Sequence, residues 1–183
     1  MGALLIVILA GIGIGLARGG SLKNLVTVKV RFMGLLYVAV ALQLGAQFVP
    51  ESASIWAYAM VVSSYAAVFV VAGANYRIPG MLVVALGALC NFTVILANQG
   101  MPISETAARA SGHAPRSLLL RGKHYLDAGT AHLRFLGDNI ALHFSPSIIS
   151  VGDIIIWIGI VVILQDLMQP ASVAQQAKPA PTT

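Results

Sequence analysis

Five long apolar runs divide this chain, and none of them contains lysine or arginine. A helix that crosses a bilayer needs about 20 predominantly apolar residues, and the runs come near that length. Backbone groups in hydrocarbon must be satisfied within the segment, so such runs are expected to be helical. The pattern predicts an all-α membrane protein: a five-helix transmembrane bundle with one long external loop, residues 99–149, before the last helix. The predicted spans cover residues 2–17, 32–49, 54–74, 79–98 and 150–168.

Charged side chains are too few to cover a water-soluble surface. The 183 residues are 58% hydrophobic and 9% charged, whereas soluble domains carry about 25% charged residues. The mean hydropathy is +0.86. The net charge of +5 comes from basic residues grouped beside apolar runs, which indicates membrane orientation and argues against nucleic-acid binding. The single cysteine, Cys90, lies inside an apolar run, where it is expected to act as a small hydrophobic residue.

The basic residues also predict the direction in which the chain crosses the membrane. Arg18, Lys23, Lys29 and Arg31 lie between the first two spans, in a link without acidic residues. Positively charged links favour the cytoplasmic side, which places the N-terminus and the 99–149 loop outside and the C-terminus inside. The tail, residues 170–183, is rich in Ala, Pro and Gln and is predicted to be disordered. Five basic residues in the long loop oppose this orientation: Arg109, Arg116, Arg121, Lys123 and Arg134.

Amide side chains recur at helical spacing within two of the predicted spans. Gln43 and Gln47 lie four residues apart, and Asn91 and Asn98 lie seven apart, so each pair shares one helix face. Buried amides need hydrogen-bond partners. They predict either hydrogen bonds between helices or a polar intramembrane pocket for a small ligand. The first four spans contain no ionisable residue except Cys90 and tyrosines, which argues against a proton relay or an ion-coupled carrier.

Two further motifs concern packing and the start of the last span. Gly11 and Gly15 form a GxxxG motif, which predicts close helix packing, either through self-association or within the same chain. Ser150 and Asp153 have the spacing of a capping box at the start of the last helix. We expect an additional partner from the loop, Arg134 or His132, to tie the loop to Asp153. Asp138, in the turn Gly137-Asp138-Asn139, is another candidate for anchoring the loop.

No cofactor or metal site is predicted from the sequence. The four histidines are separated by 11, 8 and 11 residues, without the tight local pairs typical of metal ligands. They all lie in the long loop, at positions His113, His124, His132 and His143.

Three segments, taken in their order along the chain, resemble a known family. They are LANQGMPIS (residues 96–104), KHYLDAGTAHLRFLGDNI (123–140) and SVGD (150–153). Together they are similar to a family of small multi-span bacterial membrane proteins, described as a domain of unknown function and of actinobacterial or Chloroflexi type. The resemblance implies a multi-span membrane protein. We expect a location in the bacterial cytoplasmic (inner) membrane. The resemblance implies no activity, substrate or catalytic residue.

Three functions follow as hypotheses. The first is a non-enzymatic accessory, scaffold or partner-binding component of a membrane assembly, whose partners are the lipid bilayer and other membrane subunits. The second is a small transport or ligand-binding protein that uses the amide faces. The third is a membrane-embedded enzyme in which Asp138, Asp153 and a loop histidine converge as acid–base groups.

Overall fold

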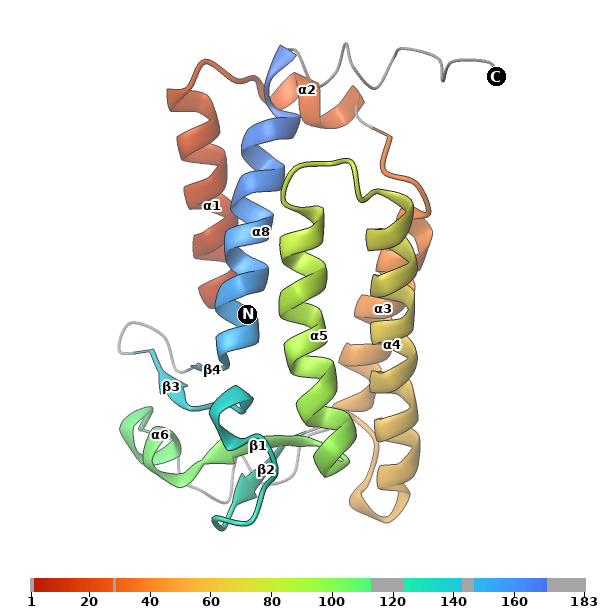
Figure 1. Ribbon diagram of the computed structural model, residues 1–183, viewed down its shortest axis with the longest axis vertical. Coiled ribbons are helices and arrows are strands. Elements are labelled where there is room, and N and C mark those ends of the chain that lie inside the picture. The colour runs from red at the N-terminus through yellow and green to blue at the C-terminus, as the bar shows by residue number, and fades with distance from the viewer. Residues whose placement is uncertain (1, 28, 113–123, 143–146, 171–183) are drawn as a thin grey trace.

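The computed structural model describes residues 2–27, 29–112, 124–142 and 147–170 (Figure 1). The described chain is mostly helical. Five longer helices account for most of it, and short elements connect them. The α-helices are α1 (Gly2–Ala17), α2 (Leu22–Thr27), α3 (Met33–Ala46), α4 (Ser54–Ala74), α5 (Met81–Asn98), α6 (Glu105–Ala110) and α8 (Val151–Leu167), with single 3₁₀ turns η1 (Glu51–Ala53) and η2 (Arg134–Leu136).

Two helices, α4 and α5, are long and apolar enough to cross a membrane by the criteria of length and composition. Helices α1 and α3 are apolar but shorter, and α8 has 17 residues. The structure therefore has two candidate spans by length where the sequence predicts five. Helix α3 stops at Ala46, three residues before the predicted end of that span. Pro50 has no N–H to donate to the Ala46 carbonyl, so the helix cannot continue across this link.

The five longer helices lie side by side in the order α1, α8, α5, α4, α3 (Figure 1). Each packs mainly on its neighbours in this row, so α1 and α3 occupy the two ends. The last helix in sequence is thus inserted between the first helix and α5. Apolar periodicity does not specify helix order, which is why the predicted bundle left this arrangement open.

Helices α5 and α8 make the closest approach, through glycines spaced seven residues apart on both helices. A Cβ at Gly80 would lie 2.5 Å from the Gly159 carbonyl oxygen, and a Cβ at Gly87 would lie 2.5 Å from that of Gly152. The two backbones therefore touch in antiparallel register, Gly80 with Gly159 and Gly87 with Gly152. Small residues at both positions are what permits this distance.

Helix α4 packs on α5 through an aromatic cluster. The ring of Phe92 lies 5.5 Å from the rings of both Tyr65 and Phe69, centroid to centroid. Val61 and Ile95 are almost fully buried in the same core. This side of α5 is thus bulky, whereas the side facing α8 is small.

The segment predicted as an external loop contains regular structure, which we call the cap: the described residues between 101 and 149. Its first sheet pairs β1 (Met101–Ser104) parallel with β2 (His124–Asp127). Its second pairs β3 (Ile140–Ala141) antiparallel with β4 (Ile148–Ile149). The cap also contains α6 and η2, and it lies at the ends of α5 and α8 (Figure 1). Met101 and Ile103 are nearly inaccessible, so β1 is a core strand and not a solvated linker.

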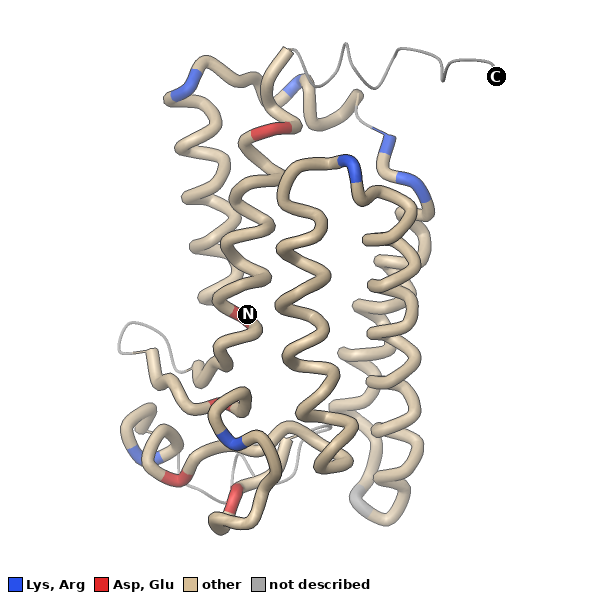
Figure 2. Tube along the Cα trace, in the orientation of Figure 1, with Lys and Arg blue, Asp and Glu red and all other residues tan. Residues whose placement is uncertain are grey.

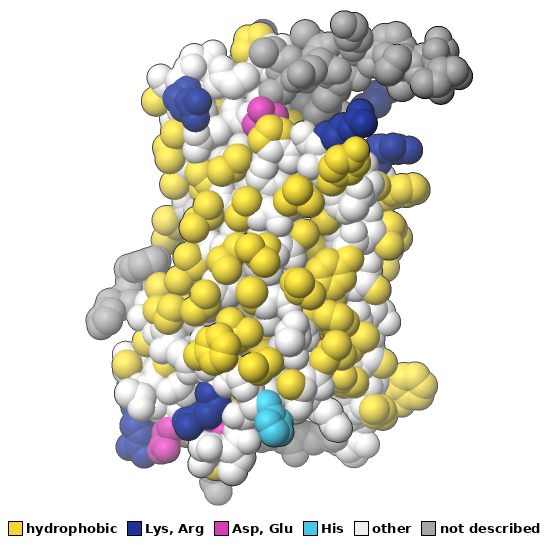
Figure 3. Space-filling view, viewed as in Figure 1, with side chains coloured by type: hydrophobic (Ala, Val, Ile, Leu, Met, Phe, Trp, Pro, Cys, Tyr) yellow, Lys and Arg dark blue, Asp and Glu magenta, His cyan; other side chains and the backbone are white. Residues whose placement is uncertain are grey.

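Charge separates the two ends of the helix row (Figure 2). At the end opposite the cap, which we call the basic end, the described residues include five cations and one acid, Asp166. Hydrophobic side chains cover the middle of the face in view (Figure 3). Exposed hydrophobic residues on the longer helices include Leu9, Tyr37 and Leu89, with 58%, 68% and 50% of their surfaces accessible. The cations of the basic end are Arg18, Lys23, Lys29, Arg31 and Arg77.

The prediction of a disordered tail concerns residues that, except for Pro170, lie outside the described residues.

Candidate functional site

A buried polar cluster joins α5 to the start of α8. Asn91 is 2% exposed and Ser150 is fully buried. The Asn91 Nδ2 group donates to Asp153 Oδ1 over 2.9 Å, and the Ser150 hydroxyl donates to Asn91 Oδ1 over 2.8 Å. The Asn91 amide thus donates through its nitrogen and accepts through its oxygen. We call Asn91, Ser150 and Asp153 the clasp.

The predicted capping box is present within the clasp. The backbone N–H of Asp153 donates to Ser150 Oγ, and the backbone N–H of Ser150 donates to Asp153 Oδ2, each over 3.0 Å. The carboxylate also lies in the first turn of α8, where the helix dipole favours negative charge. Asp153 is therefore held by its own helix end and by α5 at once.

The predicted loop partners of Asp153 are wrong, because Asn91 is the residue that reaches it from another element. Arg134 instead donates from Nε to Asp127 Oδ2 over 2.6 Å. His132 is held through its backbone. Its N–H donates to Asn98 Oδ1 over 2.7 Å, and its carbonyl accepts from Asn98 Nδ2 over 2.9 Å. Asn91 and Asn98 share one face of α5, and along that face the first meets α8 while the second meets the cap.

Asp127, which the sequence analysis did not single out, organises the turn that follows β2. Its Oδ1 accepts from the backbone N–H groups of Gly129, Thr130 and Ala131 over 2.8, 3.0 and 3.1 Å. Burial raises the pKa of this carboxyl, but the backbone hydrogen bonds and Arg134 outweigh burial, so the pKa of Asp127 is lowered. The Asp-Ala-Gly sequence at 127–129 is the signal that could have identified this turn.

Asp138 links the rest of the cap to β1. Its backbone N–H donates to the Pro102 carbonyl over 2.9 Å, and its carbonyl accepts from the Ser104 N–H over 3.0 Å. The side chain is buried, with Oδ2 at 3.4 Å from His124 Nε2. Its Oδ1 has no hydrogen-bond partner among the described residues. The hydrogen bonds of Asp138 to β1 are therefore made by its backbone, and the anchoring role of its side chain stays a prediction.

Among the described residues, the acid–base groups of the enzyme hypothesis have different partners. Asp153 is bonded to Ser150 and Asn91, whereas Asp138 lies beside His124. Within the part of the chain that the structure describes, no three His, Cys, Asp or Glu residues lie close enough to hold a metal ion. His113 and His143 lie outside the described residues.

The four predicted pocket amides lie at separate places. Gln43 Nε2 donates to Ser64 Oγ over 3.1 Å, which joins α3 to α4. Gln47 is exposed just after the end of α3, while Asn91 and Asn98 serve the clasp and the cap. Gln43 and Asn91 thus join helices, as the interhelical hydrogen-bond alternative predicted, whereas Asn98 joins α5 to the cap. The four amides do not line one common cavity among the described residues.

The GxxxG face of α1 is used within the chain. A Cβ at Gly11 would lie 2.9 Å from Leu164 Cδ1, and a Cβ at Gly15 would lie 2.5 Å from Met168 Sδ. Both glycines are buried against α8. The face predicted for self-association or internal packing is thus covered by the last helix.

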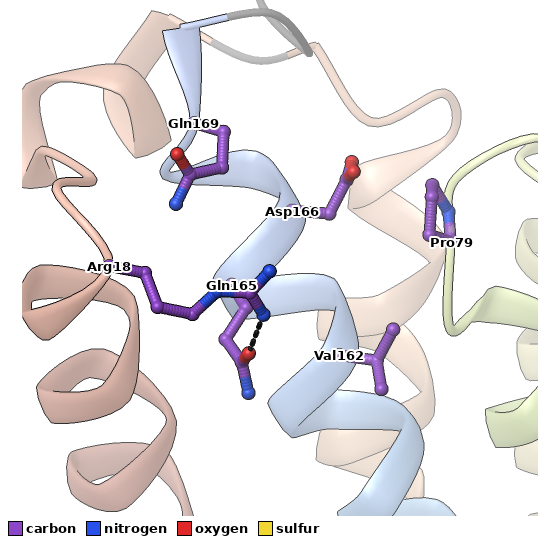
Figure 4. A pocket seen from close by; sticks show the side chains of 6 residues that line it. All are labelled: Arg18, Pro79, Val162, Gln165, Asp166 and Gln169. Atoms are coloured by element: carbon purple, nitrogen blue, oxygen red, sulfur yellow. Dashed lines mark hydrogen bonds between the residues drawn. The ribbon is translucent and has the colours of Figure 1, made fainter.

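A pocket of about 250 Å³ lies at the basic end, where α1 ends, α8 ends and α5 begins (Figure 4). Arg18 reaches toward α8 and donates from Nη1 to Gln165 Oε1 over 2.5 Å. The residues of this pocket come from distant parts of the chain, so no local sequence pattern marks it. The pocket is lined by Arg18, Pro79, Val162, Gln165, Asp166 and Gln169.

Comparison with known proteins supports the resemblance noted in the sequence. The pattern of a family of unknown function, DUF5317, matches residues 27–165. The chain belongs to this family. No curated protein and no solved structure matches it. The DUF5317 match includes α3 to α5, the clasp and the cap, and it begins after the end of α1.

Proposed function

We propose that this DUF5317 protein is an integral membrane protein that acts as a non-enzymatic, partner-binding component of a membrane assembly. The observation that carries the membrane placement is the apolar middle of the helix row, between a basic end and a capped end (Figures 2 and 3). Exposed apolar surface of this extent is costly in water and is expected in lipid. All five longer helices then lie in the bilayer.

Aromatic residues at the ends of α4 support the placement. Trp56 and Tyr76 are 66% and 52% exposed, and such side chains favour the two membrane interfaces. At a rise of about 1.5 Å per residue they lie roughly 30 Å apart, which is the thickness of the hydrocarbon core. The shorter helices α1, α3 and α8 are accommodated by local thinning of the bilayer and by polar residues at their ends.

The cations of the basic end support a cytoplasmic location for that end in a bacterial inner membrane. The N-terminus and the cap then lie outside, and the C-terminus lies inside. The cap is the surface proposed for partners, because Asn98, Asp127 and Asp138 order its backbone while Phe135 remains 68% exposed. An ordered element that presents an exposed aromatic side chain is suited to protein contact.

Membrane placement is tested by fractionation and cysteine labelling. The protein should stay in the membrane pellet after an alkaline carbonate wash. In a Cys90→Ala background, Phe135→Cys should react with an impermeant maleimide in intact cells, and Lys23→Cys only after lysis. Release by carbonate would overturn the membrane placement, and the reverse labelling pattern would overturn the orientation.

The partner-binding role is tested by photo-crosslinking from the same cap position. A crosslinking residue at Phe135 should give one discrete adduct with another membrane protein in native membranes. The matched control is the same residue at Val26, which is 87% exposed on α2 at the basic end. If the protein runs only at its own mass from both positions, the partner-binding role is rejected.

Ligand binding is a second candidate function, and the pocket at the basic end is the observation that favours it.

A further inference from the structure

We propose that the pocket at the basic end binds a phosphoethanolamine group, supplied by a phospholipid of the adjacent leaflet. The inference rests on the membrane placement proposed above. The pocket opens where α1 and α8 end (Figure 4), which is then the level of the lipid headgroups. Among the described residues, its lining offers free N–H groups, a carboxylate without an ion-pair partner, and apolar walls.

The donors come from Arg18 and Gln169. Arg18 has five N–H donors and uses one on Gln165, and it forms no ion pair among the described residues. Gln169 Nε2 is buried and has no hydrogen-bond partner in the described part of the chain. A buried amide donor without a partner is costly, so Gln169 gains from an acceptor, and the exposed Arg18 guanidinium adds a positive charge beside it. A phosphate offers several oxygens for this purpose.

The carboxylate of Asp166 indicates that the ligand carries a cationic group as well as an anionic one. It lines the same pocket as Arg18, yet no described cation lies within ion-pair distance of it. A purely anionic headgroup would leave Asp166 unpaired and beside a like charge. A headgroup that carries both phosphate and a primary ammonium satisfies Arg18 and Asp166 together. Choline does not fit equally well, because its nitrogen has no N–H to donate.

The remaining walls fit the glycerol and upper acyl region of a lipid. Pro79 and Val162 line the pocket, and Val162 is 37% exposed on α8 toward the apolar middle of the row. The volume of about 250 Å³ holds a headgroup and not a whole lipid. The acyl chains would then run along α8 in the bilayer.

Native mass spectrometry of the full-length protein, extracted in mild detergent, tests the assignment. Equal amounts of phosphatidylethanolamine, phosphatidylglycerol and phosphatidylcholine are added together. The wild type should retain phosphatidylethanolamine preferentially. Asp166→Asn should lower that preference over phosphatidylglycerol by about tenfold, the effect of one charge-assisted hydrogen bond. Arg18→Gln should weaken retention of both lipids. The control is Lys23→Gln, an exposed cation at the same end that does not line the pocket.

A second arm separates the lipid from a soluble source of the same group. Glycerophosphoethanolamine carries the headgroup without acyl chains. Weak competition by it supports a lipid ligand, whereas binding as tight as that of the lipid overturns the assignment to a lipid. Equal retention of the three lipids, or variants that behave like wild type, would overturn the phosphoethanolamine site. Thermal unfolding of each variant confirms that it is folded. A protein that resists carbonate extraction but shows no lipid preference would refute this site alone.

Discussion

The side chain of Asn91 on α5 donates to the carboxylate of Asp153 on α8 over 2.9 Å, across 62 residues of sequence. The same amide accepts from the Ser150 hydroxyl. The cap leaves the bundle at the end of α5 and returns at the start of α8. Asn91 therefore joins α5 to α8 about two helical turns before α5 ends at Asn98 and the cap begins.

Replacing Asn91 with Ala should destabilise the protein by about 1–2 kcal/mol. The variant leaves the Ser150 hydroxyl and one Asp153 oxygen without their partner, and hydrogen bonds between membrane helices are worth up to about that amount. Thermal unfolding in detergent measures the loss. Thr93→Val is the control, since Thr93 is an exposed residue of the same helix whose hydroxyl donates to the Leu89 carbonyl within its own helix. Equal unfolding temperatures for the two variants would contradict a structural role for the clasp.

Gly152→Ala should be more damaging than a glycine substitution at an open position of a helix. A Cβ at position 152 would lie 2.0 Å from Asn91 Oδ1 and 2.7 Å from the Gly87 carbonyl. The overlap forces α8 away from α5, at a cost of about 1–3 kcal/mol. Gly73→Ala in α4 is the matched control, because nothing lies within 4 Å of its Cβ and alanine favours helix. The unfolding temperature should fall for the first variant and stay level or rise for the second.

Asn98→Ala should loosen the cap without separating the helices. The variant removes both hydrogen bonds to the His132 backbone. Amide hydrogen exchange of residues 130–136 should accelerate, while exchange in α5 and α8 stays slow. Gln47→Ala serves as control, since Gln47 is an exposed amide beyond the end of α3. Unchanged exchange in 130–136 would show that other contacts hold this segment.

Acid should weaken the cap through Asp127. The folded state lowers the pKa of this carboxyl. Its contribution to stability is therefore present above the ordinary aspartate pKa of about 4, and it is lost as the pH falls through the lower, folded value. Protection factors across residues 124–136, which correct for the intrinsic pH dependence of amide exchange, should fall in that pH range. Asp127→Asn should exchange faster at neutral pH and lose most of this acid dependence. An identical pH profile in the variant would assign the effect to another group.

Leu89→Lys distinguishes a lipid-facing surface from a water-facing one. Leu89 lies midway along α5 and is 50% exposed. A lysine at the centre of a membrane helix costs about 2.5–3.5 kcal/mol, so the amount of protein in the membrane fraction should fall sharply. Val26→Lys, at the basic end, should leave it unchanged. Normal yield and improved solubility of Leu89→Lys would place this face in water.

Local features of the sequence account for much of the helical architecture. Charged and proline-containing links bound the apolar runs, so the predicted segments 2–17 and 54–74 coincide with α1 and α4. The capping box at Ser150 and Asp153 was predictable because its two residues belong to one turn. The resemblance to a family of unknown function was carried by short motifs, and it is confirmed over residues 27–165.

Contacts between distant segments were decided by the tertiary structure alone. The order of the helices, and with it the register of Gly87 against Gly152, depends on packing that apolar runs do not encode. The same holds for the parallel pairing of β1 with β2, whose residues are too few and too far apart to signal a sheet. Arg18 meets Gln165 across 147 residues. The chain's sequence thus determined which segments are apolar and helical, and the fold determined which polar side chains those helices bring together.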